Sequence, residues 1–506
     1  MGVPVVKASV TSDPSRDSSV AGEFTELPVL VRERIWGFWK FTSVNVGVAI
    51  ATWAFLTGGS IALFAGAKTA IAATVIGNLV GVVLVALSTC LPSAKYGLEQ
   101  YTALRSVFGT NGVRVLIAVM LPVSLAGWNA ILAIMFGRAV TNVLGAAFGT
   151  EFDPNGPVVI ALSLLAVAMS WLVLSRGPVS LEWVNKLVAP VLSVLTVVML
   201  VLLLGHHSLG ELAAAQPLEA YADDQLNFAA AVELSFATGF SWWTMMGNLA
   251  RLTTSQRNAF WPNIVGLFGA TVVAGAVGTF AALVVGSEDP TVWMIPIGGV
   301  ALGALALLFI AFANVTSMVS QTYAEGLALV RAAGSVVRRI PWPLFVALLF
   351  TPAAVMSFWP EVLYDQFFKF MAWVGLAMAP LTAVYITDFF VLRRRRLLVR
   401  ELYEPDGVSV YSFWRGFNPA ALVAVAAGSL TYYLLLDPVT FESAEAFRYL
   451  TASVPSLVVT AVLHAALTVL WVARAGKGGY GPPTGAAASV PAGPDAADTE
   501  RPAAVR

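Results

Sequence analysis

The sequence predicts an all-α polytopic membrane protein with twelve transmembrane helices. Three observations support this class: a scarcity of charge, a series of apolar runs of membrane length, and an alternation of basic and acidic loops. Of the 506 residues, 58% are hydrophobic and only 11% are charged, and the mean hydropathy is +0.79. A soluble protein carries roughly 25% charged residues, so most of this surface must face lipid.

Two polar tails flank the apolar region. Residues 1–31 are rich in Ser, Asp, Pro and Glu and contain no apolar stretch of the kind found in a secretory signal. Residues 476–506 are rich in Gly, Pro and Ala. Segments of such composition do not bury enough apolar surface to fold, so we expect both tails to be disordered and cytoplasmic.

The apolar runs between the tails give the number of crossings. Each crossing needs about 20 apolar residues to span a hydrocarbon core of about 30 Å. The weakest candidate is 343–358, because it is short. Five runs fall in residues 32–204, five in 205–400 and two in 401–475. The twelve runs are 41–65, 70–91, 114–142, 157–174, 181–204, 227–247, 262–285, 297–329, 343–358, 366–391, 418–435 and 450–473.

The loop charges orient these crossings, since Lys and Arg concentrate in cytoplasmic loops. With a cytoplasmic N-terminal tail, every second loop should be basic. Those loops contain Lys95, Arg105, Arg176, Arg251, Arg257, Arg331, Arg338, Arg339 and the run Arg393–Arg396. The intervening loops contain Glu151, Asp153, Glu211, Glu219, Asp223, Asp224, Glu288, Asp289, Asp437, Glu442 and Glu445. We therefore expect both termini on the cytoplasmic side of a bacterial-type plasma membrane.

Glycine and small polar residues interrupt the first and sixth apolar runs. The first contains Gly47, Thr52 and the pair Gly58–Gly59, and the sixth contains TGFSWWTMMGN at 238–248. Irregular backbone survives in a membrane only where it lines a cavity or binds a ligand, although small residues also serve close helix packing. Because these two runs begin the halves of a five-plus-five inverted repeat, the breaks indicate a substrate site.

The eighth run supplies a candidate ion site. Ala313, Thr316 and Ser317 lie at positions i, i+3 and i+4 and therefore share one helical face. Two hydroxyl oxygens beside a carbonyl form an oxygen-only site suited to a small cation, and loosened carbonyls of the first crossing would complete it. Thr and Ser also hold membrane helices together, so the pattern alone does not decide.

The crossings expected to face the substrate contain few ionisable groups. The exceptions are Arg138, Glu233 and Glu325, which are either gate or proton-relay groups or make only local bonds. A charged substrate would require an opposite charge here. Aromatic rings and an amide suit a flat, neutral, hydrogen-bonding ring instead. The residues concerned are Trp128, Asn129, Phe240, Trp242 and Trp243.

Other functional classes find little support. The net charge is zero, so no basic face indicates nucleic acid as a partner. The single cysteine, Cys90, and the three histidines show no metal-ligand spacing. The sequence has no nucleophile with a base and no phosphate loop, which disfavours an enzyme. A passive channel would show a repeated selectivity motif rather than two unlike broken helices.

Several motifs, in order between residues 32 and 435, resemble those of the nucleobase:cation symporter-1 family, which contains cytosine, purine, hydantoin and allantoin permeases. The most specific is the block 386–396, ITDFFVLRRRR. The resemblance implies a leucine-transporter-type fold, with two inverted repeats of five helices, two additional C-terminal helices and alternating access. The other motifs are ERIWG at 33–37, YGLEQYTALRSVFG at 96–109, WVN at 183–185, ELY at 401–403 and WRG at 414–416.

The resemblance also implies positions for the ligands. Sodium would be bound by the carbonyls of Gly47, Ile50 and Ala313 and the hydroxyls of Thr316 and Ser317. The substrate positions are Ala51, Leu125, Trp128, Asn129, Gly239, Phe240, Ser241, Gln321 and Thr322. The hydantoin symporter of the family has glutamine and tryptophan at the positions of Ala51 and Leu125, which argues against hydantoin as the substrate here.

The expected function is sodium symport of a small neutral nucleobase-like heterocycle by a transporter that we expect to be a monomer in the bilayer. Cytosine, another purine or pyrimidine, allantoin and related heterocycles, hydantoin among them, stay open as substrates. The alternative ion is a proton carried by Glu233 or Glu325.

Overall fold

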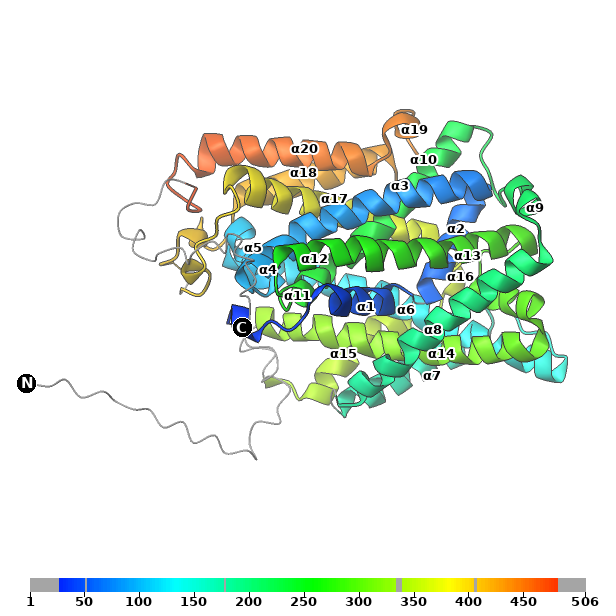
Figure 1. Cartoon of the computed structure of the whole chain (residues 1–506). Helices are drawn as coiled ribbons and strands as arrows, with labels where there is room; N and C mark the ends of the chain where they lie inside the picture. The colour runs from blue at the N-terminus through cyan, green and yellow to red at the C-terminus, as the bar shows by residue number, and fades with distance from the viewer. Residues whose placement is uncertain (1–26, 51, 177–178, 334–338, 405–406, 481–506) are drawn as a thin grey trace, which may run out of the picture.

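The computed structural model describes residues 27–50, 52–176, 179–333, 339–404 and 407–480. Within these ranges the regular elements are helices, with only isolated β-bridges besides. The expected all-α class is confirmed. Figure 1 shows the long helices running side by side across the molecule, with α4 and α5 at one end and α9 and α19 at the other.

The helices follow one another with short connections. The first half contains α1 (Phe38–Ala49), α2 (Thr52–Phe64), α3 (Ala67–Val85), α4 (Leu91–Tyr96), α5 (Gln100–Phe108), α6 (Thr110–Phe148), α7 (Pro157–Ser175), α8 (Val179–His206) and α9 (Leu209–Ala214). The second half contains α10 (Asp224–Phe240), α11 (Met246–Ala250), α12 (Gln256–Pro262), α13 (Gly269–Val285), α14 (Pro290–Ala333), α15 (Trp342–Met356), α16 (Pro360–Leu363), α17 (Phe367–Ile386), α18 (Pro419–Leu435), α19 (Phe447–Leu450) and α20 (Ser453–Leu467).

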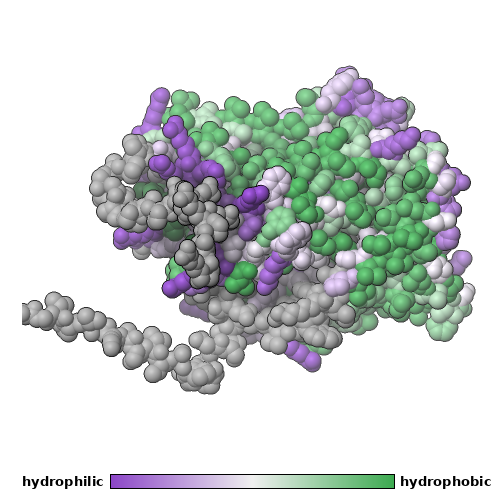
Figure 2. Space-filling model, viewed as in Figure 1, coloured by the Kyte–Doolittle hydropathy of each residue, from purple (hydrophilic) through white to green (hydrophobic). Residues whose placement is uncertain are grey.

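Helices cover all twelve predicted runs. Among the described residues, seven helices are long and apolar enough to cross a membrane, and an eighth crossing results if the bent pair α1 and α2 counts as one. Shorter apolar helices occupy 190–206, 342–356 and 419–435, and the run 227–247 is interrupted. The exact number of crossings therefore stays a prediction. Apolar side chains cover the middle of the molecule, and polar ones gather at its two ends (Figure 2).

The backbone is interrupted in both predicted places. Helix α1 ends at Ala49, Ile50 leaves the helical region with ψ of 83°, and α2 begins at Thr52. The two axes differ by 61°. In the sixth run, α10 ends at Phe240 and a 3₁₀ turn, η3 (Ser241–Thr244), leads to α11. Backbone groups freed at such helix ends need other partners, which is the property that a ligand site uses.

Close packing explains other small residues of the same runs. A Cβ atom on Gly81 of α3 would lie 2.9 Å from the Cα atom of Gly239 on α10. A Cβ atom on Gly58 of α2 would overlap the carbonyl oxygen of Gly275 on α13. These glycines let helix backbones touch, as small residues do in membrane proteins. Small residues in the first and sixth runs thus occur both at the breaks in the helices and at close helix contacts, the two explanations that the sequence left open.

A buried ion pair organises the end of the molecule that carries α4 and α5, here called the basic end. Arg393 Nε donates to Asp388 Oδ2 at 2.5 Å. The other guanidinium nitrogens donate to the carbonyl of Ser106, at the end of α5, and to that of Gly478. Tyr480 donates to the second oxygen of Asp388 at 2.6 Å. The network therefore gives Asp388 and Arg393 of the 386–396 block a structural role, which is to hold α5 and the C-terminal segment together.

Candidate substrate and ion sites

Three of the predicted substrate residues form a hydrogen-bonded cluster. Asn129 of α6 donates through Nδ2 to the Thr322 hydroxyl on α14 at 2.9 Å. Gln321 Nε2 in turn donates to Asn129 Oδ1 at 2.6 Å. Asn129 and Thr322 are fully buried. Two amides held in this way at mid-helix present fixed donor and acceptor groups, which is what the recognition of a heterocycle edge requires.

Aromatic rings from α2 and α17 contact Trp128, the neighbour of Asn129. Its ring centroid lies 5.8 Å from Trp53 of α2 and 5.1 Å from Phe370 of α17, and 6.0 Å from Phe367. Trp53 also meets Trp242 of η3 at 5.3 Å. We call Trp53, Trp128, Trp242, Phe367 and Phe370 the aromatic cluster.

The sequence analysis did not assign Trp53, Phe367 or Phe370 to the site. For Trp53 a signal was present, because it follows the break of the first run by only two residues. The two phenylalanines lie at positions i and i+3 at the start of α17. Nothing in the local sequence indicates that this face meets α6.

The predicted residues of the sixth crossing are packed into the protein. Phe240 is fully buried and stacks on Phe236 of its own helix, with ring centroids 6.2 Å apart. Gly239 lies against Gly81, and the Ser241 hydroxyl donates to the Thr238 carbonyl at 2.7 Å. In this conformation Trp242, rather than Phe240, packs against Trp53 of the aromatic cluster.

The remaining two predicted substrate positions differ in what can be said of them. Leu125 is buried on α6, one turn before Trp128 and Asn129, and so shares their face. Ala51 lies outside the described residues.

The predicted ion ligands lie on two elements: Gly47 and Ile50 at the end of α1, and Ala313, Thr316 and Ser317 on α14. The Thr52 hydroxyl, directly after the break, donates to the side-chain oxygen of Asn314 on α14. Asn314 adjoins Ala313, whose carbonyl accepts the Thr316 hydroxyl at 2.8 Å. Because α1 ends at Ala49, the Val46 carbonyl accepts the Ile50 N–H at 3.0 Å, whereas the following carbonyl, that of Gly47, has no N–H partner within α1.

The predicted ligands are of the chemical type that binds a small monovalent cation, and their convergence on one ion stays a prediction. Ile50 is buried at the end of α1, and Ser317 is half-buried one residue beyond Thr316. All the expected donors are neutral oxygens, the type of ligand that hard cations prefer. Among the described residues no group of three His, Cys, Asp or Glu side chains could hold a metal ion, so this oxygen set is the candidate metal centre.

Glu233 of α10 caps another helix. One carboxylate oxygen accepts the backbone N–H groups of Ala452 and Ser453 at 2.9 and 3.0 Å. The other accepts the Ser453 hydroxyl at 2.5 Å. These groups form the start of α20 (Ser453–Leu467), where unpaired N–H groups and the helix dipole favour a negative charge. The carboxylate is therefore fully engaged as a cap supplied by a distant segment.

Arg138 closes the end of the molecule opposite the basic end, here called the acidic end. Its guanidinium pairs with Asp289 at 3.0 Å and with Asp365 at 2.6 Å, and lies 4.5 Å from the ring centre of Tyr364. The Tyr364 hydroxyl donates to Asp289 at 3.0 Å. The network joins α6 to the segments that precede α14 and α17.

A second carboxyl group at the acidic end contacts the outer half of the first crossing. Glu288 accepts the Ser60 hydroxyl of α2 at 2.7 Å, and its backbone lies directly over Gly59. Burial, reinforced by the neighbouring negative charges of Asp289 and Asp365, raises the pKa of Glu288 to about 8. Burial therefore favours the protonated form of Glu288, against the Ser60 hydroxyl, which donates to the carboxylate and favours the charged form.

Glu325 of α14 occupies a different environment. It is buried, and its oxygen Oε2 has no hydrogen-bond partner in the described part of the chain. Its side chain bonds to Thr244 of η3, whose carbonyl accepts the Tyr101 hydroxyl at 2.8 Å. Glu325 follows Gln321 by one helical turn, so a lone carboxyl group lies next to the amide cluster.

Taken together, a first crossing broken beside an oxygen-rich helix, and an amide and aromatic cluster between crossings, define a secondary transporter of the leucine-transporter type. Solved structures have the same fold. The inward-facing conformation of Mhp1 matches with a TM-score of 0.74 at 19% identity, over 89% of this chain and 94% of that one. Mhp1 closed around bromovinylhydantoin, described as a nucleobase-cation-symport-1 family transporter, matches with a TM-score of 0.68, over 89% and 95% of the two chains.

Sequence comparison identifies the family. Residues 28–448 match the family described as permease for cytosine/purines, uracil, thiamine, allantoin. A hydantoin permease of Microbacterium maritypicum is 22% identical over 81% of this chain and 84% of its own length. A purine-uracil permease, NCS1, of Arabidopsis thaliana is 23% identical over 79% and 69%. The chain belongs to this nucleobase:cation symporter family and is an integral membrane permease, not an enzyme.

Proposed function

We propose that this permease imports a small neutral nucleobase-like heterocycle together with sodium, by alternating access to a site between the first, third, sixth and eighth crossings. The observation that carries the proposal is the paired amides of Asn129 and Gln321 beside the aromatic cluster. Aromatic faces stack on a flat ring, and amides read its donor and acceptor edges.

For the substrate, the proposal favours a purine, pyrimidine or allantoin over hydantoin. The curated relatives carry hydantoin in one case and purines and uracil in the other, as their names state. Leu125 and Ala51 lack the ring and the amide expected of a hydantoin carrier. Trp242 is the stacking surface in the described conformation, and Phe240 is available only if α10 moves.

For the ion, the proposal places sodium at the carbonyls of Gly47, Ile50 and Ala313 and the hydroxyls of Thr316 and Ser317. A cation there would link the broken first crossing to α14, the same two elements that the Thr52–Asn314 hydrogen bond joins. The ion can favour closure only through a difference in its affinity for the two conformations.

The test is uptake of radiolabelled nucleobases, allantoin and hydantoin with sodium present or replaced by choline. The double variant Thr316→Ala/Ser317→Ala should lose sodium stimulation. Thr351→Ala is the matched control, because its hydroxyl donates to its own helix on α15 in a similar way. Undiminished sodium stimulation in the double variant rejects the site.

A proton is the second candidate ion, and one observation favours it. Glu325 is a buried carboxyl group with an unpartnered oxygen, one turn from Gln321, and buried unpaired carboxyl groups in membrane helices mark proton pathways. Glu233 does not share this property, because three groups at the start of α20 occupy it. Uptake driven by a pH gradient in sodium-free buffer, and lost in Glu325→Gln, would establish proton coupling.

The proposal further includes a monomer with both termini in the cytoplasm. The basic end would then face the cytoplasm, and the Arg138 network at the acidic end would be an outer gate. Labelling of cysteines introduced at Glu361 and Arg400, with a reagent that does not cross membranes, tests this orientation. Only the first should react in intact cells.

A further inference from the structure

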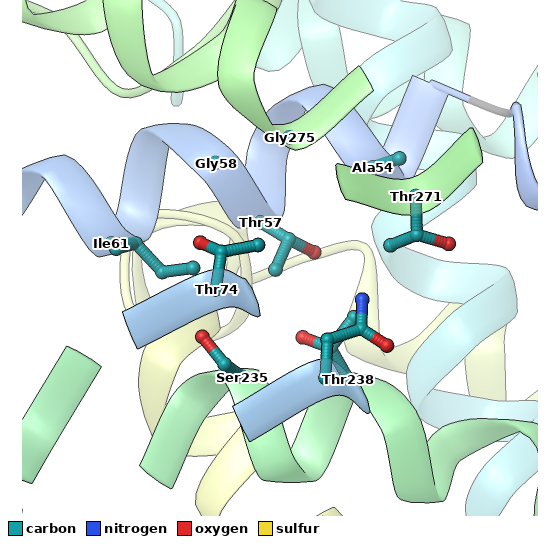
Figure 3. A pocket seen from close by; sticks show the side chains of 10 residues that line it. Ala54, Thr57, Gly58, Ile61, Thr74, Ser235, Thr238, Thr271 and Gly275 are labelled. Atoms are coloured by element: carbon teal, nitrogen blue, oxygen red, sulfur yellow. The ribbon is translucent and has the colours of Figure 1, made fainter. Parts of the chain in front are cut away.

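A polar pocket lies between α2, α3, α10 and α13, apart from both candidate sites described above. We call it the hydroxyl pocket. On α2 it begins one turn after Trp53, since the Thr57 hydroxyl donates to the Trp53 carbonyl at 3.0 Å. Figure 3 shows hydroxyl side chains from different helices gathered about one space. Its polar lining consists of Thr57, Thr74, Asn78, Ser235, Thr238 and Thr271.

The hydroxyl hydrogens of this lining are already committed to the protein. Each of the five hydroxyl groups donates to a carbonyl four residues earlier in its own helix, as Thr and Ser commonly do in membrane helices. The acceptors of Thr74, Ser235, Thr238 and Thr271 lie 2.8, 2.7, 2.8 and 2.8 Å away. The oxygen lone pairs of these groups are therefore what an occupant of the pocket would meet.

Asn78 adds an unusual feature. It is only 1% exposed, and neither its amide nitrogen nor its amide oxygen has a hydrogen-bond partner in the described residues. A buried polar group without a partner costs about 1–3 kcal/mol, and buried side-chain amides are nearly always paired. A group outside the polypeptide is therefore expected to bind here.

We propose that the hydroxyl pocket binds one small monovalent cation, of which sodium is the probe. Five hydroxyl oxygens and the Asn78 amide oxygen line a free space that accommodates about one water-sized particle. The lining contains no carboxylate, which disfavours a divalent ion. It contains no basic group either, and its hydroxyl hydrogens are taken, so the Asn78 amide is the only side-chain donor that the lining would offer to an anion, which disfavours one.

A single water molecule is the competing occupant. It has two hydrogens to donate, whereas the pocket presents six oxygens. A cation uses all of them at once by replacing its hydration shell with protein oxygens, as in ion selectivity filters. An ion in this position would bind the outer half of the first crossing, α2, to α10 of the sixth, independently of the proposed site at Thr316 and Ser317.

The experiment counts sodium ions bound per purified transporter with radioactive sodium. The wild type should bind two. Thr316→Ala/Ser317→Ala should keep one, in the hydroxyl pocket, and Thr74→Val/Asn78→Leu should keep the other. Thr382→Val is the matched control and should bind two, because Thr382 is equally buried and donates to its own helix at 2.7 Å outside the pocket.

The possible outcomes separate the two sites. If Thr74→Val/Asn78→Leu binds as much sodium as the wild type, or if Thr316→Ala/Ser317→Ala binds none, the pocket holds water only and the proposal is wrong. If uptake proves independent of sodium while Thr74→Val/Asn78→Leu still binds one ion fewer than the wild type, the cation site in the hydroxyl pocket is upheld and the proposal of sodium symport is rejected. Should the double variant not fold, Thr238→Val is read in the same way.

Discussion

Removal of the Glu233 side chain should weaken the membrane domain without altering ion coupling. Its carboxylate accepts two backbone N–H groups and one hydroxyl at the start of α20. A hydrogen bond to a charged group contributes about 1.5–3 kcal/mol, and loss of a helix cap costs about 0.5–2 kcal/mol. The two figures describe the same contacts and are not added, so Glu233→Ala should lower the free energy of unfolding by about 1.5–3 kcal/mol. Glu233→Gln keeps one acceptor oxygen and should lose about half as much.

The single cysteine provides the assay. Cys90 is fully buried, so a thiol-reactive dye reports unfolding of the detergent-purified protein as the temperature rises. Glu325→Gln is the control, because that carboxyl group caps no helix, and its melting temperature should stay near that of the wild type. If Glu233→Ala has the same melting temperature as the wild type, Glu233 does not stabilise α20 as a cap. If Glu233→Gln folds normally but loses ion-driven uptake, Glu233 takes part in proton transfer.

Three other perturbations have definite expected outcomes. Because burial raises the pKa of Glu288, the folded protein is most stable below about pH 4.5, where this group is neutral, and it loses stability as the pH rises through about 8 and the buried group ionises. The melting temperature should therefore fall over that window, and Glu288→Gln should flatten the profile. Gly58→Ala places a methyl group against the Gly275 carbonyl and should destabilise the protein by about 1–3 kcal/mol. The melting temperature, measured with the same dye, should fall; an unchanged value would show that α2 and α13 can move apart without cost. Asp388→Asn leaves the buried Arg393 without its counter-ion and should cost about 3–5 kcal/mol, visible as a loss of folded protein on size-exclusion chromatography, whereas a normal yield would contradict the role given to the pair.

The sequence was sufficient where the signal is local. Twenty-residue apolar runs and the small residues around Gly47 and Gly239 predicted the crossings and both interruptions. The family resemblance predicted positions at Asn129, Gln321 and Thr322, which the structure brings into one hydrogen-bonded cluster. Arg138 makes ion pairs with Asp289 and Asp365, and its role as a gate group stays a prediction.

The remaining features depend on contacts between distant segments. Glu233 and Ser453 are separated by 220 positions, so no periodicity within α10 indicates that the carboxylate caps α20. The rotation of α10 about its axis decides whether Phe240 or Trp242 faces Trp53, and both are aromatic residues in one short run. Hydropathy states that a helix is buried, but it does not state which of its faces meets which neighbour.

The Arg393 network has a consequence for how the chain is made. Asp388 and Ser106 both precede Arg393 in the sequence. Gly478, whose carbonyl accepts from Arg393, follows it by 85 positions, and Tyr480 comes later still. While the ribosome is still producing the last two crossings, the Arg393 guanidinium has only some of its final hydrogen-bond partners. The network is completed only at the very end of synthesis. A chain that ended directly after α20 would contain every membrane helix and would still lack the contacts of Gly478 and Tyr480 with Arg393 and Asp388.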